Sequence, residues 1–434
     1  MNYLIHGGYV VFPKDDTTII SQQDLYIKDG IIHFQKPFEQ ADKTIDATNK
    51  IVMPALTNAH NHIYSTLSKG VPCEVPFNDF MGNLKNLWWT LDHSLQKEDM
   101  ILSTAIAMKD AITQGVTTVF DHHISGYTEN ALTDMAEVFD AYGVSGTLAF
   151  ELSDRNGEEF FQKSLAENIR FAKAQKGKSV QGMIGLHASF TLSDKSLKAI
   201  ADQTEDFPVH VHVAEGEIDG IQCQEKYGKG LIERFDEYGL VRDNSLYIHC
   251  SNLTPTDLEI LKRKNIFIAQ AADSNMNNGL NVGNISSFIS EGIKTTVGTD
   301  GMHSSAFKAM KNSMIFTKYL NANCDLGYPE MNALFLNNFK LKQAFGLPLG
   351  INDGEPADIA IFDYQPATPF NTNQFLGHLI FGITESRCQY VLKHDELLLD
   401  DYHVTKDLYQ DVYARSEEIS TAMFKRFESI KGSY

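Results

Sequence analysis

Short apolar runs alternate with longer segments along the middle of the chain. These runs are rich in Val, Ile, Leu and Ala and have the length of buried β-strands. Eight are predicted as strands: Ala55–His60, Val116–Asp121, Gly146–Glu151, Gly182–His187, Val209–Val213, Leu246–His249, Ile266–Gln270 and Thr295–Asp300. The segments between them have helical spacing, such as Leu197 and Ile200 after Ser193. Strand and helix repeated eight times predict an α/β fold, a (β/α)₈ TIM barrel.

Both ends of the chain have a different pattern, in which short strands are separated by polar turns. Near the N-terminus the predicted strands are Tyr3–Phe12, Asp24–Lys28 and Ile31–Gln35. Asp29-Gly30, between the second and third of these, is a typical hairpin turn. After about residue 345 the same style returns, with an apolar run at Ile359–Phe362 and a strand at Tyr390–Leu392.

These patterns predict two domains. Residues 55–345 form the barrel, and residues 1–54 together with 346–434 form a small composite β-sandwich domain with a C-terminal helix. The helix is predicted from apolar residues spaced at helical intervals after Thr405: Leu408, Val412, Ile419, Met423, Phe427 and Ile430. It packs onto the barrel or onto a partner subunit.

Composition narrows the expected partners and compartment. The chain has 37 Lys and Arg against 56 Asp and Glu, a formal net charge of −19, so nucleic acid and membrane surfaces are not expected partners. Its five cysteines are scattered without a C-x-x-C pair, which argues against disulfides and a thiolate zinc site. We see no signal peptide and no apolar window long enough to span a membrane. We expect a reduced, soluble, cytoplasmic protein.

Histidines and a carboxylate stand at the ends of three predicted barrel strands. His60 and His62 end the first strand, and residues i and i+2 of a strand point to the same face. His212 ends the fifth strand, where His210 lies deeper in the core. Asp300 ends the eighth between two glycines, which let a ligand approach closely. Because barrel active sites lie at the carboxyl ends of strands, we expect these side chains to meet.

Three imidazole nitrogens and one carboxylate oxygen suit a divalent cation and leave a position for water. An open position is typical of a catalytic metal site. Zinc, iron and manganese all suit this set. Three further polar residues stand nearby: Glu215 in the loop after the fifth strand, His249 at the end of the sixth, and His187 at the end of the fourth. The alternative for each is an ordinary structural role.

The motifs H-N-H, H-V-A-E, I-H-C and G-T-D-G resemble the amidohydrolase superfamily, in its branch of mononuclear aminohydrolases. Among these, the sequence W-W-T-L-D at residues 88–92 is similar to the aminohydrolases called SsnA. The resemblance implies one divalent metal, zinc being favoured, held by His60, His62, His212 and Asp300. It implies catalytic roles for Glu215, His249 and Asp300, and substrate contact for His187.

The resemblance also implies a reaction, the deamination of an amino-substituted purine, pyrimidine or related ring with release of ammonia. The expected partners are this small heterocycle and further copies of the chain in a homo-oligomer. The alternatives are a chlorohydrolase, a cyclic amide hydrolase, or a metal-binding barrel without turnover. Two departures from the family pattern, Gln270-Ala271-Ala272-Asp273 and His249-Cys250-Ser251-Asn252, put the ring specificity in doubt.

Two more groups of residues are expected near the metal. The loop from Tyr64 to about Asp92 follows the first strand and carries aromatic residues that suit a wall for an aromatic substrate or packing of the loop: Phe77, Phe80, Trp88 and Trp89. Asp121-His122-His123 ends the second strand and is expected to support the ligands rather than bind the metal.

Overall fold

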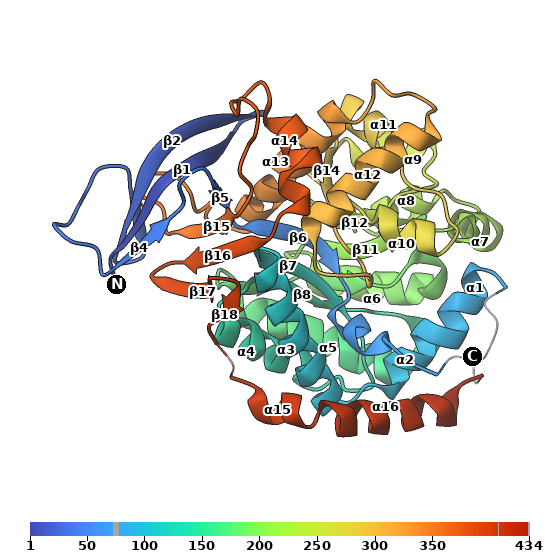
Figure 1. Cartoon of the computed structure of the whole chain (residues 1–434). Helices are drawn as coiled ribbons and strands as arrows, with labels where there is room; N and C mark the ends of the chain where they lie inside the picture. Colours follow the sequence, from blue (N-terminus) through green and yellow to red (C-terminus); the bar gives the residue numbers. More distant parts are fainter. Residues whose placement is uncertain (73–77, 407, 433–434) are drawn as a thin grey trace.

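The computed structural model describes residues 1–72, 78–406 and 408–432 of the chain. It is a mixed α/β protein in which two parallel sheets and a larger, mostly antiparallel sheet are surrounded by helices (Figure 1). Within the described residues, no helix combines the length and the apolar composition that crossing a lipid bilayer requires. The cysteines among them, Cys223, Cys250, Cys324 and Cys388, are all free thiols.

All eight predicted barrel strands overlap with parallel strands. One sheet contains four: β6 (Leu56–Asn61), β7 (Val116–His123), β8 (Ser145–Phe150) and β9 (Val180–Gly182). The other contains five: β10 (Ile184–Leu186), β11 (Val209–Val213), β12 (Leu246–His249), β13 (Phe267–Gln270) and β14 (Lys294–Val297). The fourth predicted strand is divided at Met183 into β9 and β10. The eighth ends at Val297, so Asp300 follows the strand by three residues.

Single bridges connect the two parallel sheets. Asn61 pairs with Asp300, and Leu152 pairs with Leu186, each in the parallel sense. Every residue of β6, β7, β8 and β11 is buried, as expected for strands covered on both faces. The strand ends of both sheets are therefore brought to one region of the molecule, where the βα loops begin.

Helices follow the parallel strands, and their ends agree with local capping signals. Those after β6 to β10 are η1 (Ile63–Ser68), α1 (Phe80–Asn83), η2 (Leu84–Trp88), α2 (Trp89–Ser94), α3 (Lys97–Thr113), α4 (Ala131–Tyr142), η3 (Asp154–Asn156), α5 (Glu158–Ala174), η4 (Ser189–Thr191) and α6 (Asp194–Thr204). Ser193 caps α6, since its side chain accepts a hydrogen bond from the backbone N–H of Ser196. Gly115, with φ of 74°, follows the end of α3, where glycine adopts the left-handed conformation that commonly ends a helix.

The helices of the second half have the same relation to their strands. Those after β11 to β14 are α7 (Glu217–Tyr227), α8 (Leu231–Glu237), α9 (Pro255–Leu261), α10 (Ala272–Asn277), α11 (Ile285–Ser290), α12 (Ala306–Leu320) and α13 (Tyr328–Ala344). Two later helices, α14 (Phe375–Phe381) and η5 (Ile383–Glu385), do not follow a parallel strand. Thr254 caps α9 and reciprocates with Asp257, which is a capping box.

The two ends of the chain combine in one nine-stranded sheet. Its strands are β1 (Tyr3–Lys14), β2 (Thr17–Lys28), β3 (Ile31–His33), β4 (Lys43–Asp46), β5 (Ile51–Pro54), β15 (Asp358–Phe362), β16 (Cys388–Lys393), β17 (Glu396–Asp400) and β18 (His403–Val404). The N-terminal strand β5 pairs antiparallel with the C-terminal strand β15. At the predicted hairpin, Asp29 and Gly30 both have positive φ, which matches a type I′ turn.

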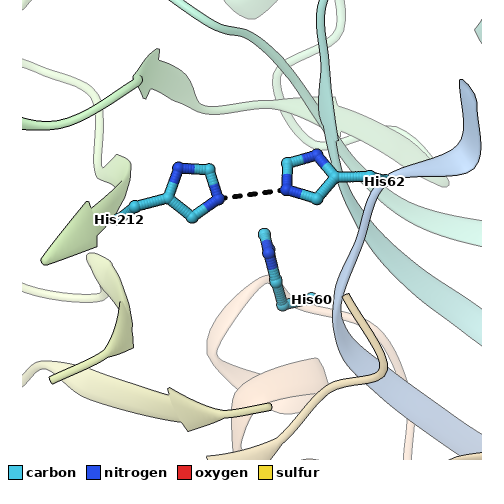
Figure 2. A group of neighbouring side chains, drawn as sticks. All are labelled: His60, His62 and His212. Atoms are coloured by element: carbon cyan, nitrogen blue, oxygen red, sulfur yellow. Dashed lines mark hydrogen bonds between the residues drawn. The ribbon is translucent and has the colours of Figure 1, made fainter. Parts of the chain in front are cut away.

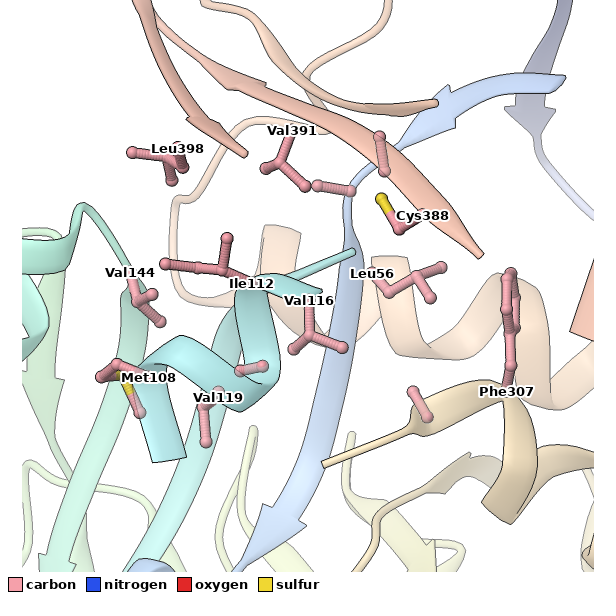
Figure 3. Packing of buried hydrophobic residues seen from close by; sticks show 14 of the residues in the cluster. Leu56, Met108, Ile112, Val116, Val119, Val144, Phe307, Cys388, Val391 and Leu398 are labelled. Atoms are coloured by element: carbon pink, nitrogen blue, oxygen red, sulfur yellow. The ribbon is translucent and has the colours of Figure 1, made fainter. Parts of the chain in front are cut away.

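The core is continuous between this sheet and the first parallel sheet. Figure 3 shows side chains of β6, α3 and β16 packed together, among them Leu56, Ile112 and Val391. Gly115 lies at this junction, where an added Cβ would stand 2.8 Å from the ring of Phe362. Apolar contact and a close backbone approach thus attach the sheet to the strands that carry the site.

The C-terminal tail forms α15 (Gln410–Ala414) and α16 (Ser416–Ile430). Ile419, Met423 and Phe427 are buried, in agreement with the predicted apolar stripe. The prediction was wrong for Leu408, which is 59% exposed because the helix begins two residues after it. Figure 1 shows α16 running along α2, and Arg426 donates a hydrogen bond of 2.7 Å to the carbonyl of Ser94.

A buried ion pair also connects α13 to β15. Lys342 Nζ lies 2.6 Å from Asp358 Oδ2, and the two side chains are 1% and 3% exposed. We expect Lys342→Met to lower the free energy of unfolding by about 3 kcal/mol, because it leaves a buried carboxylate without its closest cation. Denaturant unfolding measures the change. The double variant Lys342→Met/Asp358→Asn should recover part of the loss, and a single-variant loss under about 1 kcal/mol would contradict the expectation.

Candidate metal centre and active site

Three histidines from two parallel strands meet at the carboxyl ends of these strands. His60 lies in β6, His62 follows that strand, and His212 lies in β11. All three side chains are buried. One ring nitrogen of each lies within 4.8 Å of the others, and Figure 2 shows the three rings turned toward one another.

The hydrogen bonds behind these rings determine which nitrogens carry protons. The Nδ1 of His62 lies 2.6 Å from the carbonyl oxygen of His122, and the Nδ1 of His212 lies 3.0 Å from that of His187. A carbonyl only accepts, so both Nδ1 atoms must donate. In the neutral rings, Nε2 of His62 and Nε2 of His212 are then both unprotonated, yet they lie 3.1 Å apart. Two lone pairs at this distance repel unless a cation lies between them.

His60 brings a third ring nitrogen to the same point. Its Nδ1 lies 2.9 Å from Nε2 of His210, and its buried Nε2 has no hydrogen-bond partner in the described part of the chain. Burial lowers the pKa of His60 to about 4, and it also lowers the pKa values of His62 and His212, so the rings are neutral. Neutral imidazoles with converging lone pairs are suitable ligands for zinc or another divalent metal.

Asp300 adds a carboxylate to this group. Its Oδ1 lies 3.3 Å from Nε2 of His62 and 3.7 Å from Nε2 of His60. The backbone fit is close, because an added Cβ on Gly298 would stand 2.5 Å from the backbone nitrogen of His60. This glycine allows Asp300 to approach the histidines of β6.

His249 lies close to both Glu215 and Asp300. The Nε2 of His249 is 3.6 Å from a carboxylate oxygen of Glu215 and 3.7 Å from Oδ2 of Asp300. The Nδ1 of His249 donates to Oδ1 of Asn275 at 2.9 Å, which leaves Nε2 free to accept a proton in the neutral ring. Burial raises the pKa of Glu215, so this carboxyl holds a proton more readily than an exposed glutamate.

A cavity over the metal candidates is lined by His187, Trp88, Trp89, Glu215 and Asp300 among others. The Nδ1 of His187 lies 2.8 Å from the hydroxyl of Thr191, which orients its ring. The two tryptophans agree with the expected aromatic wall. Phe80 lines an adjoining hollow, and Phe77 lies outside the described residues.

Two of the expected supporting residues at the end of β7 bond to His62 or to the residue after it. His122 accepts from His62 through its backbone carbonyl, as described above. Asp121 accepts a hydrogen bond of 2.7 Å from the backbone N–H of Ile63 and so fixes the chain after His62. His122 itself is fully buried and stacks on His210, with 4.7 Å between ring centroids.

The two departures from the family pattern also have structural roles. The side chain of Gln270 donates a 2.6 Å hydrogen bond to the carbonyl of His249. The side chain of Asn252 donates to the carbonyls of Ala214 and Glu215, at 3.1 and 3.2 Å. Asp273 pairs with His303 at 2.7 Å. Gln270 and Asn252 therefore fix the backbones of His249 and Glu215, two of the residues expected to move protons.

Sequence reasoning missed a charged cluster in the cavity wall. Glu151 follows β8, Arg155 lies in η3, and Asp92 lies in α2; all three line the cavity. Glu151 stands at a strand end, the same signal that identified His187 and His249. No sequence motif connects Glu151 to Asp92, because the two residues lie in different βα loops and are joined through Arg155.

Comparison with known proteins identifies the family. The model of the amidohydrolase family matches residues 51–388. A 5'-deoxyadenosine deaminase of Methanosarcina barkeri is 25% identical, over 96% of this chain and 98% of its own length.

Two solved structures share the fold. One is an adenosine deaminase from Xanthomonas campestris with bound zinc, which has a TM-score of 0.82 at 19% identity and covers 98% of each chain. The other is the atrazine chlorohydrolase TrzN from Arthrobacter aurescens complexed with zinc, with a TM-score of 0.78 at 16% identity over 96% of this chain and 100% of that one. Because the family model spans most of the 434 residues, the chain belongs to the amidohydrolase family.

Proposed function

We propose that this chain is a metal-dependent aminohydrolase that deaminates an amino-substituted heterocycle, such as a purine or pyrimidine, with release of ammonia. The observation that carries the proposal is the convergence of ring nitrogens from His60, His62 and His212 beside three groups able to move protons. Those groups are Asp300, Glu215 and His249. The deaminase names of the relative and of the first structural neighbour agree with it.

His60, His62, His212 and Asp300 would hold one divalent cation. Zinc is our first choice, because the two structural neighbours carry zinc, while iron and manganese suit the same ligands. When bound, such a cation lowers the pKa of a water molecule toward neutrality and so supplies a nucleophile.

The protein's own groups then direct the protons. Asp300 takes the proton of the attacking water, and His249 holds the incoming oxygen through Nε2. Glu215 gives a proton to an unprotonated ring nitrogen, which makes the amino-bearing carbon more electrophilic. A new C–O bond forms, the C–NH₂ bond breaks after a second proton delivery, and ammonia leaves. His187, on the cavity wall, would contact the ring.

We also propose that residues 55–345 form a closed (β/α)₈ barrel. The bridges Asn61–Asp300 and Leu152–Leu186, which join the two parallel sheets, support closure. We further propose that residues 1–54 and 346–434 form the composite β domain, because β5 pairs with β15. Its sandwich form, the homo-oligomer and the cytoplasmic location stay predictions.

Other leaving groups would use the same metal. Loss of chloride is the named reaction of one structural neighbour, and opening of a cyclic amide needs the same nucleophile. A barrel that binds metal without turnover is the remaining alternative. Glu215 and His249, beside Asp300, favour turnover because a binding site needs neither.

The test is ammonia release from a panel of aminopurines, aminopyrimidines, pterins and aminotriazines by metal-replete protein. We expect at least one ring to lose ammonia. Release of chloride from chlorotriazines alone, or ring opening alone, would select the corresponding alternative, and no turnover of any compound would select the binding protein.

Removal of the metal gives a second check of the same proposal. Treatment with a chelator is expected to stop ammonia release and to lower the melting temperature by several degrees. A ligand at about 1,000 times its dissociation constant stabilises the folded state by about 4 kcal/mol. Readdition of zinc should restore both. Full activity in protein shown to contain no metal would contradict the proposal.

A further inference from the structure

The cavity wall contains an ion cluster that the proposed reaction does not use. Arg155 Nη2 lies 2.8 Å from Oδ2 of Asp92 and 2.8 Å from Oε1 of Glu151. The side chains of Arg155, Asp92 and Glu151 are 8%, 3% and 3% exposed. The Arg155 guanidinium also lies over the ring of Trp89, 5.0 Å from its centroid. Burying three charges destabilises the folded chain, so such a cluster on a cavity wall is a candidate for substrate recognition.

Glu151 has a carboxylate oxygen that is still able to accept a hydrogen bond. Its Oε1 is engaged by Arg155, while its Oε2 has no hydrogen bond among the described residues. The Nδ1 of His122, 3.9 Å from Oε2, is beyond hydrogen-bonding distance. Burial raises the pKa of Glu151 to about 8, while the ion pair with Arg155 at 2.8 Å opposes this shift and favours the carboxylate form. Glu151 can therefore accept a hydrogen bond from a ligand in the cavity.

The position of Glu151 determines which part of a substrate it can reach. One of its carboxylate oxygens lies within 4.8 Å of a ring nitrogen of His62, one of the proposed metal ligands. A group this close to the metal centre contacts atoms next to the reacting carbon rather than a remote substituent. Glu215 approaches the same centre from the loop after β11, beside His249.

Two carboxyl groups with different partners thus flank the reacting carbon. Glu215 lies 3.6 Å from Nε2 of His249 and serves as a proton donor to a ring nitrogen. Glu151, fixed by Arg155, accepts from a ring N–H. A heterocycle that satisfies both has its amino-bearing carbon between a protonated and an unprotonated ring nitrogen, as in a cyclic guanidine.

We propose that Glu151 is a specificity-determining residue that accepts the ring N–H of the substrate. The substrate class is then a 2-amino-4-oxopyrimidine ring, alone or fused, rather than an adenine-type ring, which has no N–H beside its amino carbon. This inference rests on the proposed deamination and adds the ring that the site selects.

Three probes that differ at one ring nitrogen test whether the ring N–H group is recognised. Guanine carries it, 1-methylguanine replaces its hydrogen by a methyl group, and 2-aminopurine has an unprotonated nitrogen at that position. We expect wild-type kcat/KM to be about 100-fold higher for guanine than for either analogue, because an unmade hydrogen bond leaves a buried polar group unpaired. The variant Glu151→Gln should lose about 100-fold toward guanine. It should change less than about threefold toward 2-aminopurine, whose ring nitrogen can accept from the new amide.

The matched control is Glu167→Gln. Glu167 is also a buried glutamate paired with an arginine, Arg170 at 2.7 Å, but it lies on α5 away from the cavity lining. Its substitution should leave the ratio of guanine to 2-aminopurine unchanged. Metal content and melting temperature of both variants verify that each is folded and loaded.

Equal losses toward all three probes in Glu151→Gln, or equal wild-type rates toward them, would overturn the inference. Faster deamination of adenosine than of guanine would also overturn it, while leaving the proposed function intact. If no ring loses ammonia, the proposed function fails separately. The role of Glu151 is then tested by a binding experiment, in which guanine competes with 2-aminopurine and the fluorescence of 2-aminopurine is measured. About 100-fold weaker guanine binding in the variant, with unchanged 2-aminopurine binding, supports it; equal affinities contradict it.

Discussion

Replacement of His212 by Asn is expected to remove the bound metal and to lower deamination by about 10⁴-fold. The unprotonated Nε2 of His212 lies 3.1 Å from that of His62, so the two rings would share one cation. Without the imidazole from β11, the two histidines near the end of β6 form an incomplete set. A 10⁴-fold loss corresponds to about 5.5 kcal/mol of transition-state stabilisation, which a metal-activated nucleophile can supply.

Metal content per chain and ammonia release measure this effect together. The control is His403→Asn, since His403 is exposed on β18 in the nine-stranded sheet. The control should bind metal and react like the wild type. A His212→Asn protein that keeps one metal per chain and its full rate would show that His212 is not a ligand.

Replacement of Glu215 by Gln is expected to lower kcat by about 10³-fold while leaving the metal in place. Gln has the same shape but cannot give or take the proton that the ring nitrogen needs. The raised pKa of Glu215, caused by burial, suits a residue that must hold and release a proton near neutral pH. Because Glu215 is not one of the proposed metal ligands, its replacement should not weaken metal binding.

Glu217→Gln is the matched control, because Glu217 is two residues away but exposed in the first turn of α7. Steady-state rates and metal content should separate the two variants. A Glu215→Gln protein that binds metal normally and deaminates at the wild-type rate would remove Glu215 from the mechanism.

Much of the secondary structure could be predicted from hydrophobic periodicity. All eight predicted strands overlap with parallel strands, and Ser193 lies at the start of α6, where a helix was expected. The errors are local. Met183 divides one strand, and Leu408 lies before its helix because periodicity does not determine where a helix begins.

The sequence also identified the metal candidates, because polar residues at the ends of buried strands have few structural reasons to be there. The structure brings His60, His62, His212 and Asp300 together, and their role as ligands stays a prediction. It also adds hydrogen bonds that no motif contains. The carbonyls of His122 and His187 determine which ring nitrogen of His62 and His212 points to the metal.

The sequence by itself therefore determined the family, the strand and helix order and the residues at the strand ends, since these depend on local composition and spacing. Only the tertiary structure decided which groups share the cavity. Asp92 and Arg155 are 63 positions apart and come from different loops, yet their atoms lie 2.8 Å apart. Such contacts follow from how strands and loops pack together, and packing over long sequence separations is not encoded in any short motif.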